Sequence, residues 1–249
     1  MTEPLLGVSD LRKSFGALRA CDGVSFEVAP GETHAVIGPN GAGKTTFIGQ
    51  LAGNLRPDSG RIVFAGEDIT SLPAPKRARR GLARSFQITS VYLEFTALQN
   101  VALAIQAHAG HSFRFWRDAR SDPALTGPAA RVLDQVGLGE RKHVLAANLA
   151  HGEQRQLEVA MALATAPRLL LLDEPMAGMG IEESQRMIAL LSSLKRKQTI
   201  ILVEHDMDAV FRLADRISVL VYGRVIATGS PEAVRANPEV RAAYLGEEA

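Results

Sequence analysis

The segment Gly38-Pro39-Asn40-Gly41-Ala42-Gly43-Lys44-Thr45 decides how this chain of 249 residues is interpreted. Its two glycines, lysine and hydroxyl residue have the spacing of a phosphate-binding loop. Residues 33–37 before it predict a short apolar strand, and a helix is expected from Lys44 to Leu51, so a simple glycine-rich helix cap is disfavoured. Glycine lets backbone N–H groups turn inward onto phosphate oxygens, and a helix N-terminus adds positive charge. The segment therefore predicts a nucleotide site in which Lys44 reaches the β- and γ-phosphates and the Thr45 hydroxyl holds Mg²⁺.

A second motif ends an apolar run later in the chain. Residues 168–172 predict a buried strand, and Asp173 and Glu174 follow it directly. A carboxylate at a strand end can hold Mg²⁺ through water, and its neighbour can act as the general base for an attacking water. Alone, this pattern fits a strand followed by an acidic helix cap better. Beside a phosphate loop it favours hydrolysis, with Asp173 as a Mg²⁺ residue and Glu174 as the base.

Composition narrows the class of protein. Hydrophobic residues make up 46% of the chain, which is typical of a globular domain. The 28 basic and 27 acidic side chains give a net charge of +1, so no overall attraction to nucleic acid is expected. The single cysteine, Cys21, excludes an intrachain disulfide and fits a buried apolar position. Neither a membrane-spanning run of about 20 apolar residues nor a secretory signal is recognised, so we expect a cytoplasmic protein that reaches a membrane only through a partner.

The order of predicted elements indicates an α/β fold with a mainly parallel sheet. Residues 6–11 and 23–28 alternate apolar and polar positions, as two antiparallel strands near a sheet edge do. After residue 165, predicted strands at 168–172, 199–203 and 217–221 alternate with predicted helices at 182–197 and 206–213, and such alternation is typical of parallel sheets.

The pattern in the middle of the chain predicts helices. Helices are expected at 96–109, 128–136 and 152–164, with a polar insert at 111–127. A strand is expected at 61–64, and residues 73–84 predict a basic helical stretch. We expect the cations of that stretch to form a solvated helix face: Lys76, Arg77, Arg79, Arg80 and Arg84.

Between the two motifs the sequence resembles the ABC-type ATPases. Leu149-Ala150-His151-Gly152-Glu153-Gln154 is similar to their signature motif, usually written LSGGQ. Gln87 follows the predicted strand 82–86 as the family's Q-loop glutamine does, and His205 follows strand 199–203 as its switch histidine does. Phe15 stands ahead of the phosphate loop, where the family keeps an aromatic that stacks on adenine, although packing in the core is an equal alternative.

This resemblance implies one ABC ATPase domain over residues 1–249. A nucleotide-binding α/β lobe would take residues 1–87 and 165–249, with an antiparallel β subdomain at its N-terminus, and a helical signature subdomain would take residues 88–164. The implied cofactors are ATP and Mg²⁺, with Glu174, His205 and Gln87 as catalytic residues and Thr45, Gln87 and Asp173 at the metal. The implied nucleotide contacts come from the stacking aromatic, the phosphate loop and the signature: Phe15, Gly38, Pro39, Asn40, Gly41, Ala42, Gly43, Lys44, Thr45, Thr46, Leu149, Ala150, His151, Gly152 and Glu153.

The resemblance also implies partners. Two such subunits, identical or paralogous, would pair head to tail, with each ATP held between one phosphate loop and the partner's signature. Gln87 and the helical subdomain would pass motion to two transmembrane permease subunits, served indirectly by a periplasmic solute-binding protein. No nucleic-acid partner is expected, and the protein would lie peripherally on the cytoplasmic face of a bacterial inner membrane.

A finer resemblance is to the ATPases of branched-chain amino-acid importers. It rests on five runs, which are Ala83-Arg84-Ser85-Phe86-Gln87, Thr96-Ala97-Leu98-Gln99-Asn100-Val101, His151-Gly152-Glu153-Gln154-Arg155-Gln156-Leu157-Glu158, Glu174-Pro175-Met176-Ala177-Gly178-Met179 and the ending Tyr244-Leu245-Gly246-Glu247. Importers of urea and other short amides share much of this sequence. The alternatives are therefore a urea or short-amide importer, a lipopolysaccharide-export ATPase, and a soluble ABC ATPase of repair, translation or assembly. Sustained heptads would favour the repair class and a second phosphate loop the translation class, and the sequence has neither.

Two departures from the family pattern bear on the expected mechanism. Ala150 and His151 stand where Ser and Gly are usual, so a hydroxyl that would donate to the γ-phosphate is missing. Gly180 stands where an Asp usually ends the loop after the catalytic Glu, which puts communication through that loop in doubt. Backbone N–H groups and the helix dipole remain, so the resemblance implies weakened but not abolished activity.

Overall fold

A computed structural model describes residues 3–85, 91–109 and 122–245 of the chain. Its centre is a sheet in the order β10-β9-β3-β8-β7-β6. Four neighbouring pairs are parallel, and only β10 (Arg224–Gly229) runs antiparallel to β9 (Arg216–Val221). The inner strands β3 (Thr33–Ile37), β7 (Leu169–Asp173) and β8 (Thr199–Val203) are buried at every position. Such short apolar runs suit a parallel sheet covered on both faces.

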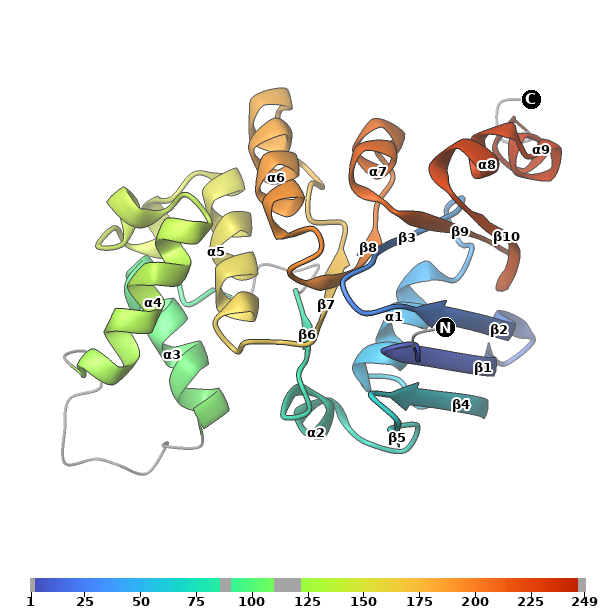
Figure 1. The fold of residues 1–249 in the computed structure, drawn as a ribbon, viewed down its shortest axis with the longest axis horizontal. Helices are drawn as coiled ribbons and strands as arrows, with labels where there is room; N and C mark the ends of the chain where they lie inside the picture. The colour runs from blue at the N-terminus through green and yellow to red at the C-terminus, as the bar shows by residue number, and fades with distance from the viewer. Residues whose placement is uncertain (1–2, 86–90, 110–121, 246–249) are drawn as a thin grey trace.

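A second, antiparallel sheet lies beside it in the order β2-β1-β4-β5 (Figure 1). Its strands are β1 (Leu6–Phe15), β2 (Leu18–Val28), β4 (Ser59–Phe64) and the two-residue β5 (Glu67–Asp68). Helix α1 (Lys44–Ala52) buries Phe47, Ile48 and Leu51 in the cluster that joins this sheet to the parallel one. The predicted α/β fold, with its N-terminal antiparallel strands and mainly parallel core, is confirmed.

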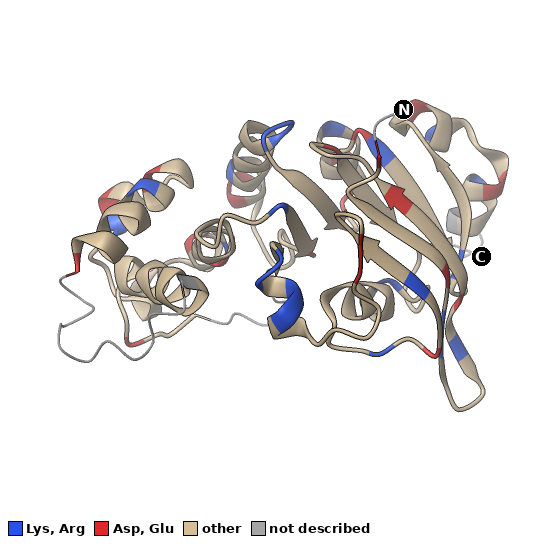
Figure 2. Ribbon diagram, turned by 60° about the horizontal axis from the view of Figure 1, so that its bottom comes forward, with Lys and Arg blue, Asp and Glu red and all other residues tan. Residues whose placement is uncertain are grey.

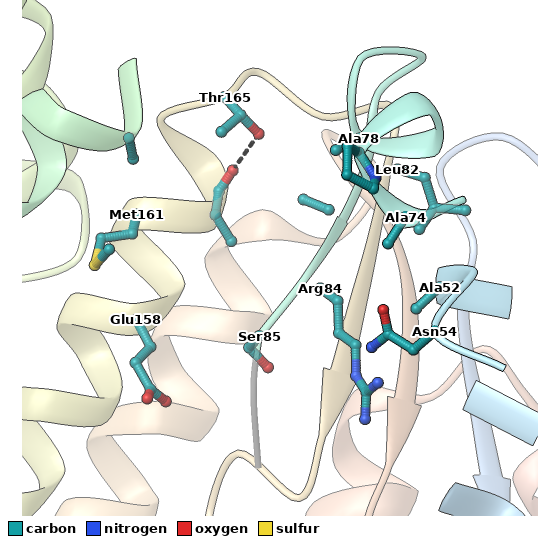
Figure 3. Close-up of a pocket in the computed structure, with 14 residues that line it drawn as sticks. Ala52, Asn54, Ala74, Ala78, Leu82, Arg84, Ser85, Glu158, Met161 and Thr165 are labelled. Carbon is teal, nitrogen blue, oxygen red and sulfur yellow. Dashed lines mark hydrogen bonds between the residues drawn. The ribbon is translucent and has the colours of Figure 1, made fainter. Parts of the chain in front are cut away.

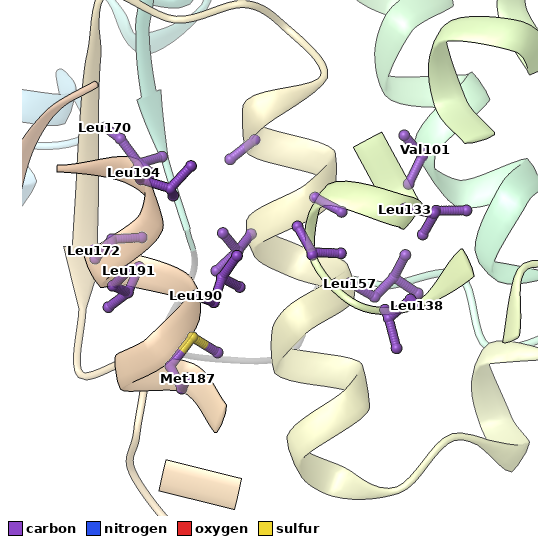
Figure 4. Close-up of a cluster of buried hydrophobic side chains, with 14 of the residues drawn as sticks. Val101, Leu133, Leu138, Leu157, Leu170, Leu172, Met187, Leu190, Leu191 and Leu194 are labelled. Atoms are coloured by element: carbon purple, nitrogen blue, oxygen red, sulfur yellow. The ribbon is translucent and has the colours of Figure 1, made fainter. Parts of the chain in front are cut away.

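Helices gather on the other side of β6 (Leu82–Arg84), on the left of Figure 1. They are α3 (Ala97–Ala109), α4 (Pro123–Gln135) and α5 (His151–Leu163), with short 3-10 turns at Gly139–Arg141 and Ala146–Asn148. Figure 4 shows how Leu157 of α5 points toward Leu133 and Leu138, while Leu191 and Leu194 of α6 (Ile181–Leu194) lie beside Leu170 and Leu172 of β7. One apolar cluster therefore runs from the helical region to β7 and β8.

Helices α7 (Met207–Leu213), α8 (Pro231–Ala236) and α9 (Pro238–Leu245) follow in the C-terminal part of the described chain. Among the described residues, no helix combines the length and the apolar character needed to cross a bilayer. Figure 2 shows basic residues gathered around α2 (Ala74–Ala78), whereas both signs of charge mix over the rest of the ribbon.

The basic stretch corrects two predictions. The helix expected over residues 73–84 is limited to α2, because Gly81 adopts a positive φ of 93° and Leu82–Arg84 then pair with β7. Arg77 is buried rather than solvated, and Arg84 is half-buried against Asp173. Whether a cation of this stretch is buried or exposed therefore depends on neighbours that are distant in the sequence.

The start of α4 is also corrected. The helix predicted from Pro128 begins at Pro123, because Asp122 accepts a hydrogen bond from the Ala124 N–H and Pro123 fills the first turn. Proline tolerates the first helical position well, so the pair Asp122-Pro123 is a better start than Pro128. Pro128 lies inside the helix, and the end of the expected polar insert is helical.

Candidate nucleotide site

The phosphate loop is fixed by close approaches of backbone to backbone. Gly38 has a φ of 155°, and a Cβ atom there would lie 2.0 Å from the Leu220 carbonyl oxygen. Gly43, at the start of α1 with a φ of 103°, would place a Cβ 2.0 Å from the Ala20 carbonyl oxygen. Real Cβ atoms do not come so close, so only glycine fits at either position.

Lys44 lies inside this loop. Its side chain is buried, and its Nζ donates to the carbonyl oxygens of Gly38 (2.5 Å) and Pro39 (2.9 Å). Asn40, Gly41 and Thr45 are exposed, while Pro39 and Thr46 are half-buried and Ala42 is buried. The ammonium group thus lies under a loop whose outer residues face solvent at a helix N-terminus, an arrangement suited to a polyphosphate.

The segments that carry Glu174 and His205 lie at the same edge of the parallel sheet as the phosphate loop. The loop follows β3, Glu174 follows β7, and His205 comes two residues after the end of β8. These strands are adjacent and parallel in the order β3-β8-β7. Because the carboxyl ends of parallel strands meet at one edge, the fold brings the three segments together, and ligands of open α/β sheets bind at that edge.

Glu174 and His205 are in direct contact. Glu174 Oε1 lies 2.5 Å from His205 Nε2, and the Glu174 N–H donates to the Val203 carbonyl of the neighbouring strand. The His205 side chain is 47% exposed and that of Glu174 is 17% exposed, so the pair is accessible from solvent. Glu174 also has a φ of 52°, which is uncommon for a non-glycine residue and is found in many functional sites.

Asp173 is buried at the end of β7. Its Oδ2 accepts from Arg84 Nη2 at 2.8 Å, whereas its Oδ1 is buried with no hydrogen-bond partner among the described residues. Thr45 supplies a hydroxyl at the start of α1. Hydroxyl and carboxylate oxygens are ligands that Mg²⁺ accepts, so these residues fit the ion. Within the described ranges, no group of three or more His, Cys, Asp or Glu side chains could hold a metal by itself.

The signature-like residues begin α5. Leu149 is buried, Ala150 is the N-cap residue, His151 is exposed and Gly152 is buried. The Ala150 N–H donates to Glu153 Oε2 at 2.9 Å, while the Gly152 N–H donates to Glu183 Oε1 at 3.1 Å. The helix therefore begins without a side-chain hydroxyl, and carboxylates cap its backbone.

The structure keeps this helix start apart from the phosphate loop. Figure 1 shows β6 and β7 between α5 and α1. Phe15 ends β1 with 49% of its surface exposed, and Lys13 Nζ lies 5.6 Å from the centre of its ring. This exposure removes the core-packing alternative for Phe15. Gln87 lies outside the described residues.

Sequence reasoning missed Glu204. This carboxylate is buried, and it accepts from the N–H of Met176 (2.9 Å) and of His205 (3.0 Å). Burial raises the pKa of Glu204 above its ordinary value, against the opposing effect of these backbone N–H groups. It joins the turn after Glu174 to the turn that carries His205, and its position beside His205 was the one available sequence signal.

A cavity of about 370 Å³ is lined by residues of α2 and β6 on one side and of α3 and α5 on the other. Figure 3 shows Glu158, Met161 and Thr165 on one side, with Arg84 and Ser85 between them and Asn54. Its lining is mainly apolar, with Arg84 reaching from its wall to Asp173. The cavity thus adjoins the candidate site through one arginine.

The family model described as "ABC transporter" matches residues 21–177, and the model described as "Branched-chain amino acid ATP-binding cassette transporter" matches residues 224–249. The chain is 41% identical to the high-affinity branched-chain amino acid transport ATP-binding protein BraF of Pseudomonas aeruginosa, over 99% of this chain and 100% of that protein. It is 39% identical to the corresponding protein LivG of Escherichia coli, over 99% and 100% of the two chains.

A more distant relative has a different solute in its name. The methionine import ATP-binding protein MetN of Brucella abortus is 36% identical over 95% of this chain and 62% of that protein. Among solved structures, an ATP-binding cassette of an ABC transporter in its ADP conformation has a TM-score of 0.87 and 29% identity, covering 98% of this chain and all of the other. A nucleotide-free cassette has a TM-score of 0.85 and 28% identity, covering 97% and 99%.

Proposed function

This chain belongs to the ATP-binding family of ABC transporters, and we propose that it is the ATP-hydrolysing subunit of an importer for branched-chain amino acids. The contact of Glu174 with His205 is the observation that best supports the hydrolytic role. It lies at the sheet edge that also carries the phosphate loop. The solute assignment rests on the names of the most similar relatives and on the family match at residues 224–249.

Each candidate residue has a task that its surroundings support. ATP binds with its phosphates over the loop 38–46, where Lys44 and the N-terminus of α1 neutralise their charge. Glu174 accepts the proton of the attacking water, and His205 holds the carboxylate in place. Mg²⁺, held through Thr45 and Asp173 with Gln87 as a further ligand, would screen the phosphate charge. Phe15 offers an exposed ring for adenine.

The second half of the site comes from another copy or a paralogue. Residues 149–153 lie at the start of α5, which β6 and β7 separate from this chain's own phosphate loop, and this separation supports the proposal that they meet ATP on a partner. Ile181, at the start of α6, leaves 81% of an apolar side chain exposed close to this helix start, as a contact surface for a second subunit would. The ATP is therefore shared between two subunits.

Two transmembrane permease subunits would receive the motion. The apolar cavity at α2, β6 and α5 adjoins Arg84, which contacts Asp173, so a permease segment there would be linked to the nucleotide site through these two side chains. A periplasmic solute-binding protein would deliver the solute, and the ATPase would work on the cytoplasmic face of the membrane. In the lobes 1–87 and 165–249 the chain binds nucleotide, and in 88–164 it presents the signature helix.

The hydrolytic role is tested with Glu174→Gln. The variant should bind ATP like the parent and hydrolyse it about 10²–10⁴-fold more slowly, as expected for loss of a general base. Glu182→Gln, which neutralises an exposed carboxylate in the first turn of α6, is the matched control and should keep full turnover. Unchanged hydrolysis by Glu174→Gln would refute the assignment.

The solute is tested separately with the chain co-expressed with its permeases. Uptake of labelled leucine should depend on the intact subunit and should be lost in the Lys44→Ala variant. If urea or a short amide is taken up and leucine is not, the solute assignment is wrong while the ATPase assignment stands.

A further inference from the structure

One carboxylate links the two parts of the chain that a second subunit would meet. Glu183 Oε1 accepts from the Gly152 N–H at 3.1 Å, and its Oε2 accepts from the Gly180 N–H at 3.2 Å. The first donor is in the opening turn of α5 and the second is the N-cap residue of α6. The side chain of Glu183 therefore caps two helices at once.

The Gly152 N–H already has an acceptor while Glu183 is in this position, and Glu183 also packs closely against Gly152. A Cβ atom built on Gly152 would lie 2.8 Å from both the Cδ and the Oε1 of Glu183. The N–H groups lower the pKa of Glu183, that of Gly152 most and that of Gly180 next, so the carboxylate is ionised. The helix start is thus already occupied by an anion.

The same helix start is the place where the proposed function needs the partner's γ-phosphate. Ala150 brings no hydroxyl, so backbone N–H groups at the start of α5 must supply the contact. A phosphate oxygen and a carboxylate oxygen that compete for one N–H repel each other. We propose that Glu183 is a positioning residue of the shared ATP site, whose carboxylate holds the Gly152 N–H until the γ-phosphate of the partner-bound ATP displaces it. This inference rests on the proposed function.

The surroundings give the displaced carboxylate a place to go. A cavity of about 810 Å³ is lined by Gly152, Glu183 and Arg186, among other residues of α4, α5 and α6. Arg186 follows Glu183 by three residues on α6 and lowers the pKa of the carboxylate by its charge. Residues three apart lie on the same helix face, so the carboxylate can turn toward this guanidinium.

Displacement would also reach the turn that carries Glu174. The Gly180 N–H loses its acceptor when Glu183 moves, and Gly180 ends a segment that begins at Glu174. Two backbone hydrogen bonds, from Ala177 to Glu174 and from Met179 to Met176, make that segment a compact turn. Arrival of the partner's ATP at α5 is thereby coupled to the catalytic turn of this subunit, although the Asp that usually ends the segment is replaced by Gly180.

The test measures the ATP concentration that gives half-maximal dimer, followed by light scattering. All proteins carry Glu174→Gln so that bound ATP persists. Adding Glu183→Gln keeps an acceptor but removes the charge, and it should lower the half-maximal ATP concentration about fivefold, the effect expected for an exposed charge interaction. Adding Glu182→Gln removes a neighbouring charge that caps nothing on α5 and should leave the value unchanged.

Two further variants separate the possible failures. Glu183→Asp keeps the charge but is too short to reach Gly152, and it should also lower the half-maximal ATP concentration, so it replaces Glu183→Gln if that variant does not fold. Ala150→Asp adds a fixed carboxylate at the helix start and should block dimers while ATP still binds the monomer.

The outcomes are distinct. An unchanged or raised half-maximal ATP concentration in the folded Glu183 variants, with Ala150→Asp still blocking dimers, overturns the role of Glu183 alone. If Ala150→Asp forms dimers like its parent, or if the parent forms none with ATP, the proposed shared site is wrong and this inference fails with it.

Discussion

Arg77 should contribute more to stability than any other cation of the basic stretch. Its side chain is 1% exposed, and its guanidinium donates four hydrogen bonds to backbone carbonyls. Two of the acceptors, Gln50 and Leu51, belong to the last turn of α1, whose carbonyls carry the negative end of the helix dipole. The helix that starts at the phosphate loop is thus closed at its far end by a buried cation.

The magnitude follows from two opposing effects. Hydrogen bonds to a charged group stabilise by about 1.5 kcal/mol each at the low end, or about 6 kcal/mol for four. Burial lowers the pKa of Arg77 to about 10 from an ordinary value of 12.5, which corresponds to a cost of about 3 kcal/mol for keeping the cation inside. The difference predicts that Arg77→Met destabilises the protein by about 3 kcal/mol.

The measurement is urea unfolding followed by circular dichroism. Arg77→Lys keeps the charge but not the planar set of donors of the guanidinium. Its free energy of unfolding should therefore lie between that of the parent and that of Arg77→Met. Arg79→Met changes an exposed neighbour on the same basic stretch and should stay within about 0.5 kcal/mol of the parent. Equal stability of Arg77→Met and Arg79→Met would refute the reasoning.

Three further predictions follow from other buried groups. Lys44→Ala should abolish hydrolysis and weaken ATP binding in calorimetry, because it removes the ammonium from the phosphate loop; equal affinity would contradict the site. Cys21 is buried with its pKa raised to about 11, so a thiol reagent should modify it only after unfolding, and rapid labelling of the folded protein would contradict its position. Burial lowers the pKa of His34, which outweighs the raising effect of Glu32. As the pH falls below 6.5, His34 is therefore protonated in the unfolded state before it is protonated in the folded state. The free energy of unfolding should drop by up to about 1.4 kcal/mol per pH unit until the pH reaches the pKa of His34 in the folded state. In thermal melts, acidification should lower the melting temperature of His34→Gln less than that of the parent. Equal decreases in the two proteins would refute this prediction.

The predicted fold was confirmed where local sequence decides the structure. Strands β3, β7 and β8 are runs of apolar residues buried at every position, and the motifs stand directly after them. Once these strands are parallel neighbours, the meeting of the phosphate loop, Glu174 and His205 at one edge follows from topology. This part of the candidate site was therefore accessible from the sequence.

Contacts between distant segments were not accessible. Arg77 and Arg79 stand two positions apart in the same basic stretch, yet Arg77 donates to carbonyls of α1 and Arg79 faces solvent. Arg84 was predicted to be solvated, but the parallel pairing of β6 with β7 brings it to Asp173. The sequence pattern shows that these residues are cations. It does not show their hydrogen-bond acceptors, because the acceptors belong to elements far along the chain.

The candidate site divides into two parts that are held in different ways. Glu174 and His205 follow the adjacent strands β7 and β8, and buried Glu204 accepts hydrogen bonds from the backbone of both turns, so the sheet fixes their relative position. The start of α5 belongs to another layer and is joined to the catalytic turn through Glu183. Changes at Glu174 should therefore lower turnover and let ATP-bound dimers persist, whereas changes at Glu183 should alter the ATP concentration at which dimers form. A Glu183 variant that lowered turnover while leaving the ATP dependence of the dimer unchanged would show that the two parts are held by one framework.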